Sequence, residues 1–209
     1  MPYRVLIVDD QRMSRQLFES IVASNERYAV AAAVETAMFA DAWCARGGID
    51  LVLMDVVMKD GSNGLDAAAR IKASYPEIKV IIVTSMPDPL FLKKARDARV
   101  DSFWYKEVDS EPMLRVMDKT MAGEPVWPDR APEVRLGLIK NSELTEREMD
   151  VLRLLAEGRT DREIGERLEL ALPTVRYHVR NLISKTGYSS RTELAVDAVR
   201  SGLTIPGIG

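Results

Sequence analysis

VLIVDDQRMSRQ, residues 5–16, places four apolar residues directly before two adjacent aspartates and a polar stretch that favours a helix. The uninterrupted apolar run is typical of a strand that is buried on both faces. That strand ends on Asp9 and Asp10, and two neighbouring negative charges at the end of a buried strand are unfavourable unless a cation lies beside them. The stretch therefore predicts a buried strand whose end binds a positive charge.

Short apolar runs rich in valine and isoleucine alternate with longer amphipathic stretches through the first half of the chain. Because strand and helix alternate five times, the pattern predicts an α/β fold with a doubly wound five-stranded parallel sheet. Strands are expected at residues 4–8, 29–34, 51–54, 80–83 and 103–105, and helices at residues 14–24, 37–46, 65–74, 89–99 and 111–121.

The composition changes after this region. Residues 123–142 hold three prolines and two glycines with weak periodicity, so this stretch is interpreted as a linker. The runs LTERE and RTDRE then each place a threonine three residues before a glutamate, which is a capping box at a helix start. A third helix follows Pro173 and a fourth starts near Ser189 or Ser190, so a small all-α domain is predicted. The expected domains are residues 1–122, the linker 123–142 and residues 143–209.

Charge and cysteine content limit the function classes. A net charge of −3 argues against a protein that is basic overall, so any contact with nucleic acid has to come from a local patch. The single cysteine, Cys44, excludes an intramolecular disulfide and a multi-cysteine metal site. The first residues lack the longer apolar core of a signal peptide, and no apolar run approaches the ~18 residues of a membrane span. We expect a cytoplasmic protein without a membrane partner.

The carboxyl ends of the expected strands carry polar side chains. In a doubly wound sheet these ends form the rim where ligands bind. Asp9 and Asp10 follow the first strand, Asp55 the third, Thr84 the fourth and Lys106 the fifth. Carboxylate oxygens suit a hard cation such as Mg²⁺, and an aspartate beside it can accept a phosphoryl group as a nucleophile. The sequence thus predicts a phosphoryl-accepting magnesium site at this rim.

Each of these residues also fits an ordinary role when it is taken alone. Asp9 could cap the next helix, Thr84 could satisfy a strand-end amide, and Lys106 could be a solvated charge. The ordinary roles do not explain why all of them fall at strand ends.

The segments VLIVDDQ, LVLMDVVM, VIIVTS and FWYK have the order and spacing of the receiver domain of two-component response regulators, which residues 2–122 resemble. The resemblance implies a flavodoxin-like receiver fold, phosphorylated by a sensor histidine kinase. The resemblance implies that Asp55 is the phosphoacceptor. It implies that Mg²⁺ is held by Asp9, Asp10, Asp55 and the main-chain carbonyl of Val57. It also implies that Thr84 and Lys106 contact the phosphoryl group and that Thr84 and Phe103 are switch residues.

The chain departs from that family at three places. Lys59 follows Met58 where the family usually has proline, and the stretch KDGSNG is one residue longer than is common. Arg99 stands where the family often has glycine. The first two departures leave the geometry of the acceptor loop and the lifetime of a phosphoryl group open.

Residues 144–199 resemble the NarL/FixJ (LuxR-type) helix-turn-helix domain in LTERE, EIGERL, TVRYH, KTG and RTE. Residues 173–186 carry basic side chains and no acidic residue, so a helix formed by them can enter the major groove of DNA. A solvated basic face on an ordinary helix is the alternative. Ala171 stands where the family commonly has a serine cap. The candidate DNA contacts are Thr174, Arg176, Tyr177, Arg180 and Lys185.

Together these features predict a two-domain regulator rather than an enzyme. Phosphoryl transfer to Asp55 is expected to shift the receiver and to promote dimerisation through the last helix and binding of promoter DNA. Two alternatives remain open: the same architecture controlled without phosphorylation, and a phosphatase that uses aspartate and Mg²⁺.

Overall fold

The computed structural model describes residues 1–106 and 112–204. The chain forms two compact units, one of Met1–Ser85 with Pro89–Ala131 and the other of Met86–Asp88 with Pro132–Gly209. The stretch expected as a linker, residues 123–142, is thus divided between the two units. Within the described residues, no helix combines the length and the apolar character that crossing a membrane requires.

The first unit contains a five-stranded sheet in the order β2-β1-β3-β4-β5, in which every neighbouring pair is parallel. This confirms the predicted doubly wound fold. The apolar runs of the central strands are buried, namely residues 5–8 of β1, all of β3 and residues 80–83 of β4, as their unbroken apolar sequences require. The strands are β1 (Tyr3–Val8), β2 (Tyr28–Val34), β3 (Leu51–Met54), β4 (Lys79–Thr84) and β5 (Ser102–Tyr105).

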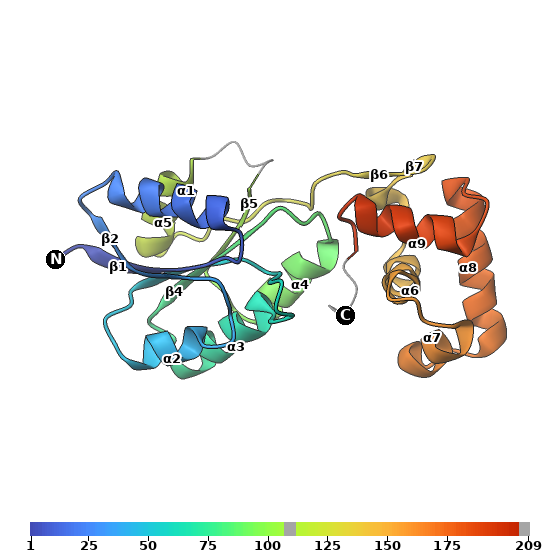
Figure 1. Ribbon diagram of the computed structural model, residues 1–209, viewed down its shortest axis with the longest axis horizontal. Coiled ribbons are helices and arrows are strands. Elements are labelled where there is room, and N and C mark those ends of the chain that lie inside the picture. The colour runs from blue at the N-terminus through green and yellow to red at the C-terminus, as the bar shows by residue number, and fades with distance from the viewer. Residues whose placement is uncertain (107–111, 205–209) are drawn as a thin grey trace. The chain divides into compact units, whose positions relative to one another are not determined.

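In the part of the first unit that the structure describes, five helices cover the two faces of this sheet. In Figure 1, α1 and α5 lie on one face, and α2 and α3 on the other, with α4 packed beside α3. The expected helix at 111–121 begins at Met113, after Pro112 as its N-cap, and Glu111 lies outside the described residues. The helices are α1 (Arg12–Ala23), α2 (Ala40–Ala45), α3 (Gly64–Ser74), α4 (Pro89–Asp97) and α5 (Met113–Met121).

Helix α2 begins later than the predicted residue 37. The hydroxyl of Thr36 accepts the N–H of Met38 at 3.1 Å, and the hydroxyl of Ser62 accepts the N–H of Ala37 at 3.1 Å. These side chains offer the backbone partners outside a helix. The first helical turn therefore forms only from Ala40.

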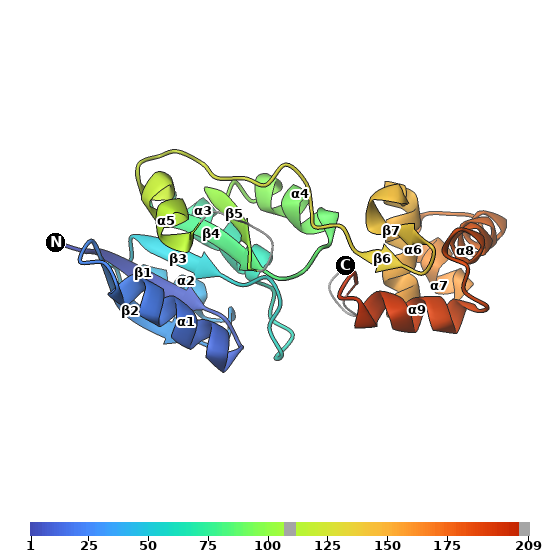
Figure 2. The ribbon, with the colours of Figure 1, turned by 90° about the horizontal axis from the view of Figure 1, so that it is seen from above.

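The described residues of the second unit form four α-helices, as predicted. Helix α6 packs against α8 and α9, and α7 packs against α8 (Figures 1 and 2). Both expected capping boxes are present, at the starts of α6 and α7, and Ser190 caps α9. Alanine at position 171 offers no side-chain cap to α8. The helices are α6 (Glu146–Ala156), α7 (Asp161–Leu168), α8 (Leu172–Thr186) and α9 (Arg191–Arg200).

A small hairpin, which the sequence analysis did not predict, precedes these helices. Strands β6 (Arg135–Leu136) and β7 (Ile139–Lys140) pair in antiparallel fashion, and a 3₁₀ turn follows at Asn141–Glu143. Leu136 is completely buried in the core of the second unit. The tip of the hairpin is fixed because the N–H of Leu138 donates to the carbonyl of Thr186 at 2.9 Å.

Candidate functional site

Three carboxylates meet at the carboxyl ends of β1 and β3. These strands are parallel neighbours with Val8 opposite Met54, so the residues that follow them come together. Oxygen atoms of Asp9, Asp10 and Asp55 lie within 4.8 Å of one another. Asp9 is 2% exposed and Asp55 is 5% exposed, so two of the three charges are shielded from water. The predicted acidic rim therefore exists as one compact cluster.

Lys106, directly after β5, supplies a cation to this cluster. Its Nζ donates to Oδ2 of Asp9 at 2.6 Å and to Oδ2 of Asp55 at 2.7 Å. Burial raises the pKa of Asp55 to about 6, although the ammonium of Lys106 opposes the rise. Burial alone would lower the pKa of Lys106, but the charge and hydrogen bond of Asp55 outweigh it and the pKa is raised. Lys106 is therefore held in its charged form between two acids.

Two residues that the sequence analysis did not assign to the rim hold Asp9 in place. Its carboxylate also accepts the hydroxyl of Ser14 at 2.5 Å, and Arg15 donates to the carbonyl oxygen of Asp9 at 2.6 Å. Both residues lie on the first turn of α1, directly after the aspartates. Their closeness in the sequence was the available signal, since a helix that starts at a strand end points its first side chains back at that end.

Asp10 is held by the acceptor loop instead. The N–H of Lys59 donates to Oδ2 of Asp10 at 2.9 Å, and Nζ of Lys59 lies 3.7 Å from the same oxygen. The side chain of Lys59 is 77% exposed, whereas that of Asp10 is 8% exposed. The lysine that replaces the usual proline thus places a second, solvated cation at the rim.

The acceptor loop depends on a glycine that the sequence analysis did not single out. Gly64 opens α3, and a Cβ built on it would lie 1.7 Å from the carbonyl oxygen of Asp55. The N–H of Gly64 donates to the carbonyl of Val56 at 2.8 Å, and Val57 forms a β-bridge with Asn63. Only a residue without a side chain allows the helix to start this close to Asp55.

The long stretch KDGSNG is tied to the loop after β2. Asp60 accepts the hydroxyl of Thr36 at 2.5 Å, and it accepts the N–H of Ser62 at 2.9 Å. These hydrogen bonds, the one from Thr36 first, hold the pKa of Asp60 below its ordinary value. The acceptor loop with its extra residue is therefore anchored to the loop after β2.

The two expected switch residues lie on neighbouring strands. Thr84 ends β4, is completely buried, and accepts the N–H of Lys106 at its carbonyl oxygen at 2.9 Å. Phe103 lies on β5 opposite Ile82 and is also completely buried. Thr84 is thus joined to the rim through Lys106, whereas Phe103 lies further back along the sheet.

The donor set of the rim fits a hard divalent cation. Asp9, Asp10 and Asp55 offer carboxylate oxygens within one cluster, and Mg²⁺ is bound by such oxygens together with water and phosphate. The excess of negative charge over the one buried ammonium favours a cation as well.

The second unit presents a basic helix. In α8, Val175, Val179 and Leu182 are buried. The outward residues include Arg176, whose side chain is 62% exposed, and Tyr177, which is 59% exposed. The four candidate contacts on the exposed side are Thr174, Arg176, Tyr177 and Arg180.

The fifth candidate, Lys185, has a partner within the fold. Its Nζ lies 2.8 Å from Oε2 of Glu148, whose side chain is 6% exposed. Burial alone would raise the pKa of Glu148, but the hydrogen bond from Lys185 and the cap at Thr145 lower it. Lys185 therefore joins α8 to α6, and a phosphate contact by this residue has to compete with Glu148.

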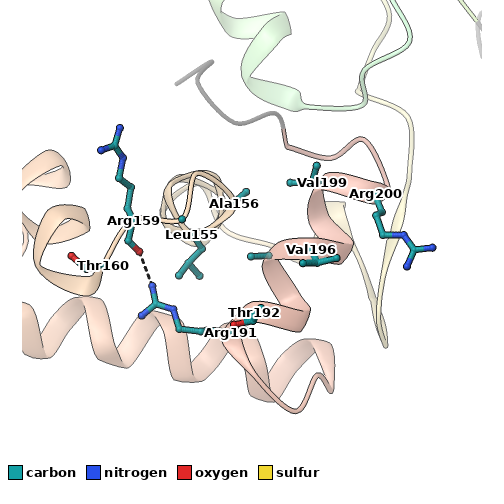
Figure 3. Close-up of a pocket in the computed structure, with 11 residues that line it drawn as sticks. Leu155, Ala156, Arg159, Thr160, Arg191, Thr192, Val196, Val199 and Arg200 are labelled. Carbon is teal, nitrogen blue, oxygen red and sulfur yellow. Dashed lines mark hydrogen bonds between the residues drawn. The ribbon is translucent and has the colours of Figure 1, made fainter.

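A groove of about 520 Å³ lies between α9 and the end of α6. Figure 3 shows Leu155, Val196 and Val199 on its apolar walls, with the side chain of Arg200 directed away from them. Arg191 donates to the carbonyl of Arg159 at 2.7 Å at one end of the groove. Val196 is 51% exposed and Val199 is 39% exposed, so α9 leaves an apolar strip open to solvent.

Comparisons with known proteins cover both units. Residues 5–118 match the family described as the response regulator receiver domain, and residues 142–198 match the bacterial regulatory proteins of the luxR family. The response regulator protein VraR of Staphylococcus aureus strain Mu3 is 33% identical over 208 residues, which cover 97% of this chain and 99% of VraR.

Solved structures agree with the fold. A structure of two RcsB dimers bound to two parallel DNAs aligns with a TM-score of 0.61 at 18% identity and covers 96% of this chain and 99% of RcsB. A LuxR-family DNA-binding response regulator from Staphylococcus aureus aligns with a TM-score of 0.53 at 27% identity and covers 57% of this chain and 98% of that one.

Proposed function

We propose that this chain, which belongs to the response regulators with a LuxR-type output domain, regulates transcription in response to phosphorylation of Asp55. The observation that carries the proposal is the meeting of three carboxylates within 4.8 Å, with Lys106 bonded to two of them. Such a rim needs a cation to balance its charge and offers one carboxylate to a phosphoryl donor.

In this proposal a sensor histidine kinase donates the phosphoryl group. An oxygen of Asp55 forms a bond to phosphorus while the bond from phosphorus to the kinase imidazole breaks, and the imidazole nitrogen keeps the electron pair. Asp9, Asp10, Asp55 and the carbonyl of Val57 would hold Mg²⁺, which supplies positive charge to the phosphoryl oxygens. The ammonium of Lys106 and the hydroxyl of Thr84 bond the transferred phosphoryl oxygens.

The output domain carries the response to DNA. We assign residues 1–122 to the receiver, 123–142 to the linker and 143–209 to the output domain. The exposed side of α8 supports groove binding because it combines arginines with a tyrosine and lacks carboxylates. The proposed contacts with promoter DNA are Thr174, Arg176, Tyr177, Arg180 and Lys185.

The open apolar strip of α9 supports a homodimer. Val196 and Val199 border the groove in Figure 3, and a second copy that covers them would remove exposed apolar surface from water. RcsB is described as a dimer on DNA, and the same assembly is proposed for this chain. A regulator that binds promoter DNA works in the cytoplasm, which is the proposed location.

Phosphorylation of the full-length protein by acetyl phosphate tests the proposal. Asp55→Ala should abolish the shifted band on a Phos-tag gel, because only Asp55 is placed to attack. Asp66→Ala, an exposed aspartate on the first turn of α3, is the matched control and should be labelled like the wild type. Persistent labelling of Asp55→Ala would refute the assignment.

The same experiment separates the two alternatives. A regulator controlled without phosphorylation would show no labelled wild-type protein and equal DNA affinity with and without acetyl phosphate. A phosphatase would turn over small phosphoesters many times, whereas a regulator only loses its own phosphoryl group. The DNA-binding output domain favours the regulator.

A further inference from the structure

The segment that leaves the receiver lies along the edge of its sheet. β5 is the last strand in the sheet order, and the N–H of Phe103 donates to the carbonyl of Val126 at 2.9 Å. The N–H of Val126 donates in turn to the hydroxyl of Ser102 at 3.0 Å. The start of the linker is therefore hydrogen-bonded to the strand that carries the candidate switch aromatic.

The next linker residue contacts that aromatic side chain directly. The ring of Trp127 stacks on Phe103 with centroids 6.1 Å apart and an angle of 29° between the planes. The guanidinium carbon of Arg96, on α4, lies 4.4 Å from the centroid of Trp127. An aromatic pair and a cation over a ring are both attractive contacts that depend on geometry. Trp127 is thus held from two elements of the receiver.

These contacts explain why Phe103 is buried although it lies on an edge strand. Phe103 is 0% exposed, with Tyr105 packed beside it at 5.0 Å and Trp127 stacked on it. A movement of Phe103 would remove the surface on which Trp127 rests. The position of the Phe103 ring and the attachment of the linker to the receiver are therefore coupled.

The acidic rim is connected to Phe103 and the linker through β5. Lys106 stands three residues after Phe103 and is bonded to Asp55 at 2.7 Å. Phosphorylation turns the Asp55 carboxylate into an acyl phosphate, so Lys106 loses that partner and gains phosphoryl oxygens. Lys106 directly follows β5, so a change in the partners of Lys106 acts on the end of the strand that carries Phe103.

We propose that Trp127 and Arg96 are positioning residues of the switch: they hold Phe103 and the linker together before phosphorylation, and phosphorylation of Asp55 loosens the stack and frees the linker. This rests on the proposed function, because it requires a phosphoryl group at Asp55. By reciprocity, loss of the stack has to change the response of the receiver as well as that of the linker.

Labelling the full-length protein with 5-fluorotryptophan tests the coupling. The chain has three tryptophans, and Trp127→Phe assigns the resonance of Trp127. Addition of acetyl phosphate and Mg²⁺ should shift that resonance and increase its exposure to solvent, whereas Trp43 on α2 serves as the internal reference. An unchanged Trp127 resonance in protein that a Phos-tag gel shows to be phosphorylated would overturn the inference and leave the proposed function intact. An unphosphorylated wild type would instead refute the proposed function, and the inference with it.

A second experiment keeps the fold and removes only the cation. Arg96→Gln should reduce the phosphorylation-dependent gain in DNA affinity about fivefold or more, the lower end of ordinary coupling between sites. Lys93→Gln removes an exposed charge from the same helix and should keep the wild-type gain. Equal gains in both variants, with equal melting temperatures, would mean that the stack only packs the linker and that Arg96 positions nothing.

Discussion

Replacing Gly64 by alanine tests how closely the start of α3 and the phosphoacceptor depend on each other. The new Cβ would lie 1.7 Å from the carbonyl oxygen of Asp55 and 3.0 Å from the side chain of Met54. Protein Cβ atoms essentially never approach other heavy atoms within 3.0 Å, so the loop and the strand end must separate by about 1.3 Å. The atom that has to yield is backbone, which cannot move without carrying Asp55.

This displacement sets the size of the effect. A misplacement of about 1 Å at a reacting group costs roughly 100-fold in rate, so Gly64→Ala should slow phosphorylation of Asp55 by acetyl phosphate by about that factor. Overpacking should also lower the free energy of unfolding by about 1–3 kcal/mol. The rate is measured from the shifted band on a Phos-tag gel, and the stability by urea unfolding.

Gly61, in the same loop, provides the matched control. It has φ +80°, and among the described residues a Cβ on it would meet nothing within 4 Å. Gly61→Ala therefore introduces backbone strain of about 1–2 kcal/mol without a clash at Asp55. If Gly64→Ala and Gly61→Ala phosphorylate at the same rate, the close approach of α3 does not position the acceptor and the reasoning is wrong.

Four further substitutions have defined outcomes. Asp101→Asn should lower the free energy of unfolding by about 1.5–3 kcal/mol at neutral pH, because it weakens the partly buried, charge-assisted hydrogen bonds that Lys72 and Lys79 donate to Asp101. Burial alone would raise the pKa of Asp101 but its lysine partners lower it, so the difference from wild type should shrink in urea titrations as the pH falls below about 4. Lys59→Ala should tighten Mg²⁺ binding, measured by calorimetry, by up to about fivefold, because the substitution removes an exposed cationic side chain from the rim. The gain should be smaller at high salt. Arg180→Ala should weaken DNA binding by about 1–3 kcal/mol at one base position, measured with a randomised site library, and should leave the fold unchanged. Lys185→Ala should also lower the melting temperature, because it leaves the buried carboxylate of Glu148 without its ammonium partner.

The sequence predicted the parts of the fold that depend on patterns within one segment. Strand β3 was predicted with the bounds that the structure has, because LVLM is apolar without interruption and is buried on both faces. The capping boxes of α6 and α7 were predicted because a threonine and a glutamate three residues apart determine a helix start by themselves. The acidic rim was predicted because parallel strands bring their carboxyl ends to one edge.

Features that depend on partners far apart in the sequence were not predicted. The pair of Lys185 with Glu148 joins residues 37 positions apart, and the local pattern of α8 does not distinguish Lys185 from the other basic residues of the helix. The hairpin after the first unit was read as a linker, because two-residue strands are too short to show periodicity. Gly64 escaped notice for a similar reason, since its constraint comes from a carbonyl oxygen nine residues earlier.

The charge balance at the rim underlies the proposed switch. Three carboxylates face one buried ammonium, and Lys59 adds a cation only at the solvent side. In the proposed function, phosphorylation of Asp55 replaces its carboxylate by an acyl phosphate, so the hydrogen bond from Lys106 to Asp55 would not persist in its present form. The main-chain N–H of Lys106 donates to the carbonyl of Thr84, so Lys106 also joins the ends of β4 and β5. In the proposed switch, a change of partner at the rim acts through Lys106 on the ends of β4 and β5, and the linker that rests on Phe103 is the element that responds.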